Sequence, residues 1–232
     1  MRTLIIIPAY NEAESIGGVI SDIKRNHPGA EILVINDGST DDTGQKAEQT
    51  NSASVINLPY NLGIGGAIQT GFKYAKRENY QLVVRMDGDG QHLAESITKI
   101  KEPVLKGEAD IVIGSRFLNE MRPTSTPIRK IAQRLISFLI SALLRQKITD
   151  VFSGFRCYNQ KAIAILSKYY PLDYPEPEEI IFLKKNKFRI KEVGVLMKER
   201  EMGSSSLNYL YFALKVTLSI FISFLRTPTI KK

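Results

Sequence analysis

The sequence predicts an α/β protein with a Rossmann-like, mostly parallel β-sheet flanked by helices, and three observations support this fold class. Short β-branched apolar runs alternate with amphipathic stretches through the first 120 residues. The runs are almost continuously apolar, as strands buried on both faces are. With 232 residues, of which 43% are hydrophobic and 24% charged, the chain can form one large domain with a substantial core.

The elements of the first half follow one another at the spacing of strand–helix–strand units. We predict strands at residues 4–7, 32–35, 55–56, 82–86 and 111–113, with helices at 12–26, 40–50, 66–78 and 93–106. Such units have right-handed crossovers and place their strands in parallel. We therefore expect the ligand to bind just beyond the carboxyl ends of these strands.

The second half is less regular. Residues 127–145 predict a helix with polar side chains every three or four positions and an apolar stripe opposite them. Residues 149–159 are rich in turn formers, a helical stretch then runs to residue 169, and residues 171–177 form a Pro-rich connector. A helix at 178–186 and a strand at 188–197 follow. Residues 207–226 predict a second two-faced helix.

Charge and composition limit the partners and the compartment. The net charge is +8, but residues 1–120 hold 12 Lys and Arg against 16 Asp and Glu, whereas residues 121–232 hold 20 against 8. This asymmetry favours a polyanionic partner for the basic half, either nucleic acid or an anionic membrane. Because tryptophan is absent and no segment interleaves arginine with aromatic residues, nucleic acid gains little support.

Neither a secretory signal nor an ordinary membrane span is indicated. The apolar stretch at residues 4–7 is too short for the core of a signal peptide, and no run of twenty uncharged apolar residues occurs. We therefore expect a cytoplasmic protein. One cysteine and two histidines exclude an internal disulfide and a zinc centre built from Cys or His clusters.

The clearest chemical signal follows the predicted strand at 82–86. Asp87 and Asp89, separated by Gly88, can present two carboxylates to one cation, and Gln91 could add an amide oxygen. Oxygen ligands of this type suit Mg²⁺ or Mn²⁺ together with substrate phosphates. The alternative is an ordinary Asp-Gly turn. His92 is expected to support the carboxylates rather than to bind a metal.

Other strand ends also carry polar residues. Asp37 follows the second strand and could accept a hydrogen bond from a nucleobase or ribose, or could belong to a turn. Residues 61–67 resemble a glycine loop that cradles phosphate, although close backbone packing explains these glycines equally well. Arg116 ends the last strand, and Arg129, Arg134 and Arg156 lie downstream, where guanidinium groups would suit phosphate oxygens.

With these motifs in order along almost the whole chain, the sequence resembles the family 2 glycosyltransferases, which have the GT-A fold. The matching segments are residues 8–12, 36–43, 61–71, 87–92, 114–116, 150–156 and 199–205. Within the family it is most similar to polyprenyl-phosphate sugar synthases of the dolichol-phosphate mannose synthase type. Residues 174–178 are similar to small bacterial enzymes that charge undecaprenyl phosphate for the decoration of cell-wall polysaccharides.

The resemblance implies roles for individual residues. The nucleotide-sugar site would comprise Pro8, Ala9, Tyr10, Glu12, Asp37, Asp87 and Arg200. The divalent metal would be held by Asp87, Asp89 and Gln91. Arg116 and Arg129 would bind the acceptor phosphate, although Gln133 stands where the family often has a serine. Asp89 and Arg200 would act in catalysis, as would Asp150 if the acceptor were a sugar hydroxyl that needs a general base, for which Glu178 is the alternative.

The expected reaction is the transfer of a sugar, with inversion, from a nucleotide sugar that we expect to be UDP-linked to a polyprenyl phosphate. The catalytic domain would span residues 1–204, with a donor half at 1–120 and an acceptor half at 121–204. Residues 205–232 would form an amphipathic helix at the membrane interface, so the enzyme would lie peripherally on the inner face of the cell membrane. The resemblance also allows a small membrane protein partner or a homo-oligomer.

Three alternatives remain at this point. A soluble family 2 enzyme could use the same metal site to glycosylate a saccharide hydroxyl. A nucleotidyltransferase is disfavoured because residues 8–12 lack the glycine-rich segment expected after its first strand. A basic module without catalysis that binds polyanions or membranes would not need the pair Asp87 and Asp89.

Overall fold

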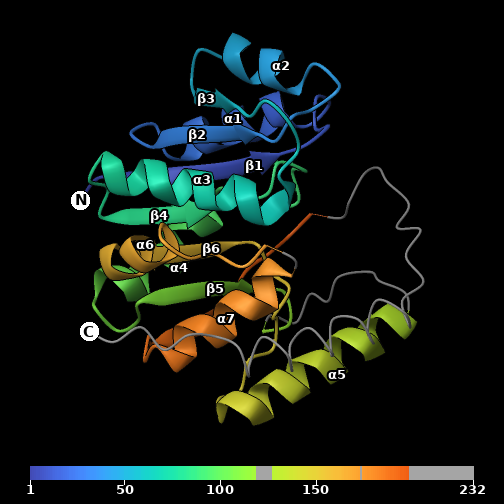
Figure 1. The fold of residues 1–232 in the computed structure, drawn as a ribbon, viewed down its shortest axis with the longest axis vertical. Helices are drawn as coiled ribbons and strands as arrows, with labels where there is room; N and C mark the ends of the chain where they lie inside the picture. Colours follow the sequence, from blue (N-terminus) through green and yellow to red (C-terminus); the bar gives the residue numbers. More distant parts are fainter. Residues whose placement is uncertain (119–126, 173, 199–232) are drawn as a thin grey trace.

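The computed structural model of the chain describes residues 1–118, 127–172 and 174–198. These residues form one seven-stranded sheet with helices on both faces (Figure 1). The strands are β1 Thr3–Ala9, β2 Glu31–Asn36, β3 Ser54–Asn57, β4 Leu82–Arg85, β5 Ile111–Ser115, β6 Arg156–Asn159 and β7 Ile190–Gly194. The helices are α1 Ile16–Asn26, α2 Thr43–Gln49, α3 Gly63–Arg77, α4 Ser96–Leu105, α5 Pro127–Leu144, α6 Gln160–Leu166 and α7 Pro175–Lys185.

The sheet has the strand order β3-β2-β1-β4-β6-β5-β7. Only β6 runs antiparallel to its neighbours, β4 and β5, and the other neighbouring pairs are parallel. The predicted α/β class and mostly parallel sheet are therefore confirmed. Because β1, β2, β4 and β5 point the same way, the polar segments that follow them emerge at one edge of the sheet.

Two apolar layers enclose the sheet. Helices α3, α5, α6 and α7 pack on one face, where the ring of Phe72 meets the ring of Tyr158 edge-on at a centroid distance of 4.9 Å. Helices α1, α2 and α4 pack on the other face. Strand β1 contributes Ile6 to the first layer and Ile5 to the second, which explains why its sequence is apolar without alternation.

The second half of the chain departs from the sequence prediction in two places. The segment expected to be turns, 149–159, contains β6, which lies in the middle of the sheet. The expected Pro-rich connector ends early, because α7 begins at Pro175 rather than near residue 178. Proline suits the first turn of a helix, where its missing N–H leaves no hydrogen bond unmade.

Helix α5 exposes the apolar stripe predicted for it. Ile131, Leu135, Phe138 and Leu139, here called the α5 outer face, are 66%, 53%, 68% and 37% exposed. The helix packs on the sheet through other residues, which are Ile136, Ile140 and Leu144. Ser137, predicted to lie on the polar side, is buried and donates from its hydroxyl to the carbonyl of Thr149 at 3.2 Å. The apolar stripe of α5 therefore faces outward and does not pack into the core.

The predicted helix at 207–226 and the interface segment 205–232 lie outside the described residues. The division into a catalytic domain at 1–204 and a terminal helix remains a prediction. In the described part of the chain, no helix combines the length and apolar character needed to cross a membrane.

Candidate active site

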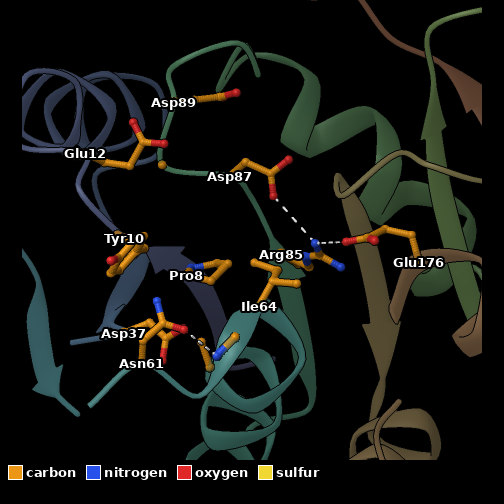
Figure 2. A pocket seen from close by; sticks show the side chains of 14 residues that line it. Pro8, Tyr10, Glu12, Asp37, Asn61, Ile64, Arg85, Asp87, Asp89 and Glu176 are labelled. Carbon is orange, nitrogen blue, oxygen red and sulfur yellow. Dashed lines mark hydrogen bonds and ion pairs between the residues drawn. The ribbon is translucent and has the colours of Figure 1, made fainter. Parts of the chain in front are cut away.

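A pocket of about 390 Å³ opens at the carboxyl edge of the sheet (Figure 2). It is bordered by the segments that follow β1, β2 and β4, by the start of α3 and by the first turn of α7. Its lining residues are Pro8, Ala9, Tyr10, Glu12, Asp37, Asn61, Gly63, Ile64, Ala67, Arg85, Asp87, Gly88, Asp89 and Glu176. The structure thus brings together seven residues of the predicted donor and metal sites with part of the 61–67 loop, and it adds Arg85 and Glu176.

The segment after β1 is tied to the segment after β2. Asn11 has a positive φ of 55°, and its side-chain oxygen accepts from the backbone N–H of Thr40 at 2.9 Å. The backbone N–H of Glu12 donates to the hydroxyl of Thr43 at 2.8 Å. These contacts turn the chain sharply after β1 and leave Tyr10 and Glu12 on the pocket wall. Asn11 therefore stabilises this turn.

Asp37 joins the pocket to the loop before α3. Its side chain is buried, and its Oδ1 accepts from the backbone N–H of Leu62 at 2.8 Å. Gly38 has a φ of 65°, and a Cβ there would lie 2.6 Å from the carbonyl carbon of Tyr60. Only glycine permits this close approach. Asp37 therefore fixes the glycine loop and also lines the pocket, so both sequence interpretations of this residue are compatible.

Asp87 stands at the centre of the site (Figure 2). Its Oδ2 lies 3.0 Å from Nε2 of His92, and its Oδ1 lies 3.7 Å from a guanidinium nitrogen of Arg85. Burial would raise the pKa of Asp87, but the His92 contact and the positive charges of Arg85 and Arg116 outweigh it and lower that pKa. Asp87 is therefore an anion near neutral pH. His92 supports it, as the sequence predicted.

Asp89 sits on the tight turn that follows. Its Oδ1 accepts from the backbone N–H of Gln91 at 3.1 Å, and Gly90 has a positive φ of 75°. The Asp-Gly turn and the acidic pair are thus one feature, because the turn presents Asp87 and Asp89 to the same pocket. Gln91 does not line the pocket, so the structure does not add its side chain to the proposed ligands.

The carboxylates fit a hard divalent cation that arrives with phosphate oxygens. Asp87, Asp89 and Glu12 all border the upper part of the pocket (Figure 2). No group of three or more acidic, His or Cys side chains in the described residues forms a complete metal site by itself. Mg²⁺ is commonly bound by one or two carboxylates, with substrate phosphates and water supplying the remaining ligands. The donor set is compatible with Mg²⁺ or Mn²⁺ on a diphosphate.

Arg116 and Asp150 form a tight pair beside the acidic turn. Asp150 is 1% exposed, and its two oxygens accept from the backbone N–H of Arg116 at 3.0 Å and from its Nε and Nη2 at 2.7 Å each. The carboxylate of Glu192 accepts from the backbone N–H groups of Thr149 and Asp150, although burial raises its pKa. Asp150 is therefore committed to orienting Arg116, which is a poor arrangement for a general base.

The structure gives two arginines positions that the sequence did not predict. Arg156, suggested as a phosphate-binding residue, is fully buried and pairs with Glu179 at 3.1 Å. Arg85 was not predicted as a site residue from the sequence, but it lines the pocket. The sequence did hold a signal for Arg85, because it is a charged residue in an otherwise apolar strand and a buried charge requires a partner.

The side chains of Arg129 and Arg200, the remaining predicted site residues, are not described by the structure. Arg129 belongs to α5, but its side chain lies outside the described part of the structure, and Arg200 lies beyond residue 198. Their proposed contacts with phosphate stay predictions.

Sequence relatives place the chain among known enzymes. It is 32% identical over 219 residues to the polyprenol monophosphomannose synthase of Mycolicibacterium smegmatis, covering 89% of this chain and 81% of that protein. It is also 32% identical to the undecaprenyl-phosphate mannosyltransferase of Micrococcus luteus, covering 90% and 88%. A UDP-N-acetylglucosamine–dolichyl-phosphate N-acetylglucosaminyltransferase of Methanococcus voltae is 31% identical, covering 82% and 83%.

Solved structures show the same fold. The glucosyl-3-phosphoglycerate synthase of Mycobacterium tuberculosis, in complex with Mn²⁺, UDP and phosphoglyceric acid, superposes with a TM-score of 0.74 at 20% identity, covering 98% of this chain and 79% of that one. Residues 4–166 match the family described as Glycosyl transferase family 2. The strand-end pocket, the sequence relatives and this match agree, and the chain belongs to the family 2 glycosyltransferases, with a GT-A fold.

Proposed function

We propose that this glycosyltransferase moves a sugar from a nucleotide sugar, UDP-linked in our interpretation, to the phosphate of a membrane-bound polyprenyl phosphate such as undecaprenyl phosphate. The observation that carries this proposal is the pocket itself, where Asp87 and Asp89 face the same space as Tyr10 and Asp37. The product would serve the decoration of cell-envelope polysaccharide. Relatives named for polyprenol, undecaprenyl and dolichyl phosphates support the choice of acceptor.

The donor would lie along the pocket. Asp37 and Tyr10 would contact the nucleoside, and the carboxylates of Asp87 and Asp89 would hold Mg²⁺ or Mn²⁺ against the diphosphate. When bound, such a cation supplies positive charge against a leaving diphosphate. A relative named for UDP-N-acetylglucosamine and a structural neighbour in complex with Mn²⁺ and UDP-glucose support a UDP-linked donor.

The acceptor would approach beside Arg116. A phosphate monoester is already anionic at neutral pH, so its oxygen can attack the anomeric carbon in line, with inversion, without a strong general base. The arrangement of Asp150 agrees with an acceptor that needs no base. Both oxygens of its carboxylate hold Arg116, and Arg116 can then bind the phosphate. The rival acceptor, a saccharide hydroxyl, would need a base where the structure has this closed ion pair.

The membrane would be met by the α5 outer face. Its four large apolar side chains are exposed on a helix that begins beyond the carboxyl edge of the sheet (Figure 1). Apolar faces of this kind insert into the boundary between headgroups and acyl chains. We propose that α5, together with the helix that the sequence predicts at 207–226, holds the enzyme on the inner face of the cell membrane.

A transfer assay tests the proposal. The full chain is incubated with Mn²⁺ or Mg²⁺, a panel of UDP- and GDP-sugars, and either a short-chain polyprenyl phosphate or the matching polyprenol. We expect a glycolipid from the phosphate with at least one donor and none from the alcohol. Transfer to saccharide hydroxyls with none to polyprenyl phosphate would instead establish the rival function.

A further inference from the structure

The end of the pocket farthest from Tyr10 and Asp37 is formed by an ion pair (Figure 2). Arg85 is the last residue of β4, and its side chain is 2% exposed. Glu176 stands in the first turn of α7, and its side chain is 19% exposed. A guanidinium nitrogen of Arg85 lies 2.5 Å from Oε1 of Glu176. The arginine is therefore a buried support, and the carboxylate is the part that a ligand can reach.

A second ion pair that involves α7 has a purely structural role. Glu179, one turn further along α7, pairs with Arg156 at 3.1 Å, and both side chains are fully buried. The hydroxyls of Tyr158 and Tyr170 also donate to Glu179, at 3.3 Å and 2.6 Å. That closed cluster already fixes α7 against the sheet. Glu176 differs because its carboxylate borders the pocket.

The position of Glu176 determines which part of a donor it would meet, an argument that rests on the proposed function. A nucleotide sugar has its diphosphate between the nucleoside and the sugar. With the nucleoside at Asp37 and the diphosphate at Asp87, the sugar extends toward Arg85 and Glu176. We infer that Glu176 recognises the donor sugar by accepting hydrogen bonds from its hydroxyl groups, and that Arg85 holds the carboxylate in place.

The local charges further restrict the sugar. Arg85 lies between two carboxylates, those of Glu176 and Asp87. Asp87 would be shared with the cation, so the carboxylate that faces the sugar is that of Glu176. An ionised carboxylate only accepts hydrogen bonds, and bonds that it accepts are stronger than those between neutral groups. The site therefore favours a neutral, hydroxylated sugar and repels a uronic acid.

Calorimetry with donor fragments tests this role. The dissociation constants of UDP and UDP-glucose, and of GDP and GDP-mannose, are measured with Mn²⁺ for the wild type and for Glu176→Gln. We expect Glu176→Gln to weaken binding of the sugar nucleotide by about tenfold, since the sugar hydroxyls lose a charged acceptor, and to leave binding of the parent diphosphate within twofold. The same variant should bind UDP-glucuronic acid more tightly than the wild type does.

Two further variants keep the test decisive. Glu176→Asp keeps a charge for Arg85 but withdraws the carboxylate by one methylene, so it should show the same selective loss even if Glu176→Gln folds poorly. Glu108→Gln is the matched control, because Glu108 pairs with Lys191 on the surface and does not line the pocket.

The outcomes separate the two proposals. An equal loss for diphosphate and sugar nucleotide, or no loss for either, would show that Glu176 only supports the fold, and the inference would be overturned. If the wild type bound neither nucleoside diphosphate nor sugar nucleotide, the proposed function itself would be wrong.

Discussion

The two halves of the sheet use charge in different ways. In the half built on β1 to β4, Asp87 and Asp89 follow a strand and face a pocket, and the side chain of Asp87 remains 35% exposed. In the half built on β5 to β7, arginines form ion pairs with buried carboxylates, as in the pairs Arg116–Asp150 and Arg156–Glu179. The first half leaves its acidic pair open to a ligand, whereas the second uses these two ion pairs to position or bury its arginines; the pair Arg85–Glu176 links the two halves.

This contrast bears on how the charged residues of the sequence are distributed in the fold. The basic excess of residues 121–232 suggested a cationic surface for a polyanion. In the described residues, Arg156 is buried and Arg189 donates to Asp110. A surplus of arginine in the sequence therefore does not translate directly into free positive charge. Among the described residues, a guanidinium that is oriented for a phosphate is that of Arg116, which follows β5 and precedes the basic residues 121–232.

The largest expected effect comes from the open acidic turn of the first half. Asp89→Asn removes one negative charge from the proposed cation site and keeps the size of the side chain. We expect transfer to fall by at least about 10³-fold, or about 4 kcal/mol of transition-state stabilisation. The measurement is initial rate with saturating donor and Mn²⁺, with thermal unfolding to confirm that the fold survives.

Asp42→Asn is the matched control for this variant. Asp42 is an exposed residue after β2 that does not line the pocket, and its transfer rate should stay near that of the wild type. Near-normal turnover by Asp89→Asn, or by the wild type in excess chelator, would contradict the metal role.

A smaller effect is expected in the second half, where Asp150 acts through Arg116. Asp150→Asn removes the charge that holds the guanidinium, so the arginine should be oriented less well toward a phosphate. We expect KM for the polyprenyl phosphate to rise by about 30-fold, equivalent to about 2 kcal/mol, while the dissociation constant of UDP stays within twofold. Steady-state kinetics with both substrates varied, together with UDP calorimetry, provide the check.

This split distinguishes positioning from catalysis by a base. If Asp150 were a general base for a hydroxyl acceptor, Asp150→Asn would lower kcat and leave KM for the acceptor almost unchanged. An equal weakening of UDP and acceptor would indicate only a disturbed fold, which a lower melting temperature would confirm.

The same contrast explains how far the sequence could predict the structure. Each strand of the first half is a β-branched apolar run followed by an amphipathic helix, and these signals are local. Strand β6 has no such signal, because its four residues are Arg, Cys, Tyr and Asn. It is a strand because β4 and β5 lie on either side of it, and the charge of Arg156 is accommodated by Glu179.

The candidate site divides in the same way. Asp87 and Asp89 could be found because they follow a strand directly and are two residues apart. The contact between Arg85 and Glu176 joins residues 91 positions apart, so no local pattern could pair them. The exposure of the α5 outer face could not be predicted either, because an apolar stripe in a helical sequence can face the core or the outside of the protein.

The smallest expected effect concerns that outer face. Phe138 is 68% exposed, and Phe138→Ser should leave the core intact because α5 packs on the sheet through Ile136 and Ile140. If α5 lies in a membrane interface, the variant loses the partial burial of one aromatic ring, about 1 kcal/mol, and binding to anionic liposomes should weaken by about fivefold. Co-sedimentation of the full chain with vesicles containing phosphatidylglycerol measures this partitioning.

The control for Phe138→Ser is a large apolar residue exposed elsewhere. Leu105, at the end of α4 on the other face of the sheet, is 50% exposed, and Leu105→Ser should leave liposome binding unchanged. Activity adds a second criterion, because Phe138→Ser should slow transfer to a long polyprenyl phosphate in vesicles but not to a short, water-soluble one. Equal binding by both variants and the wild type would mean that α5 is not the membrane contact.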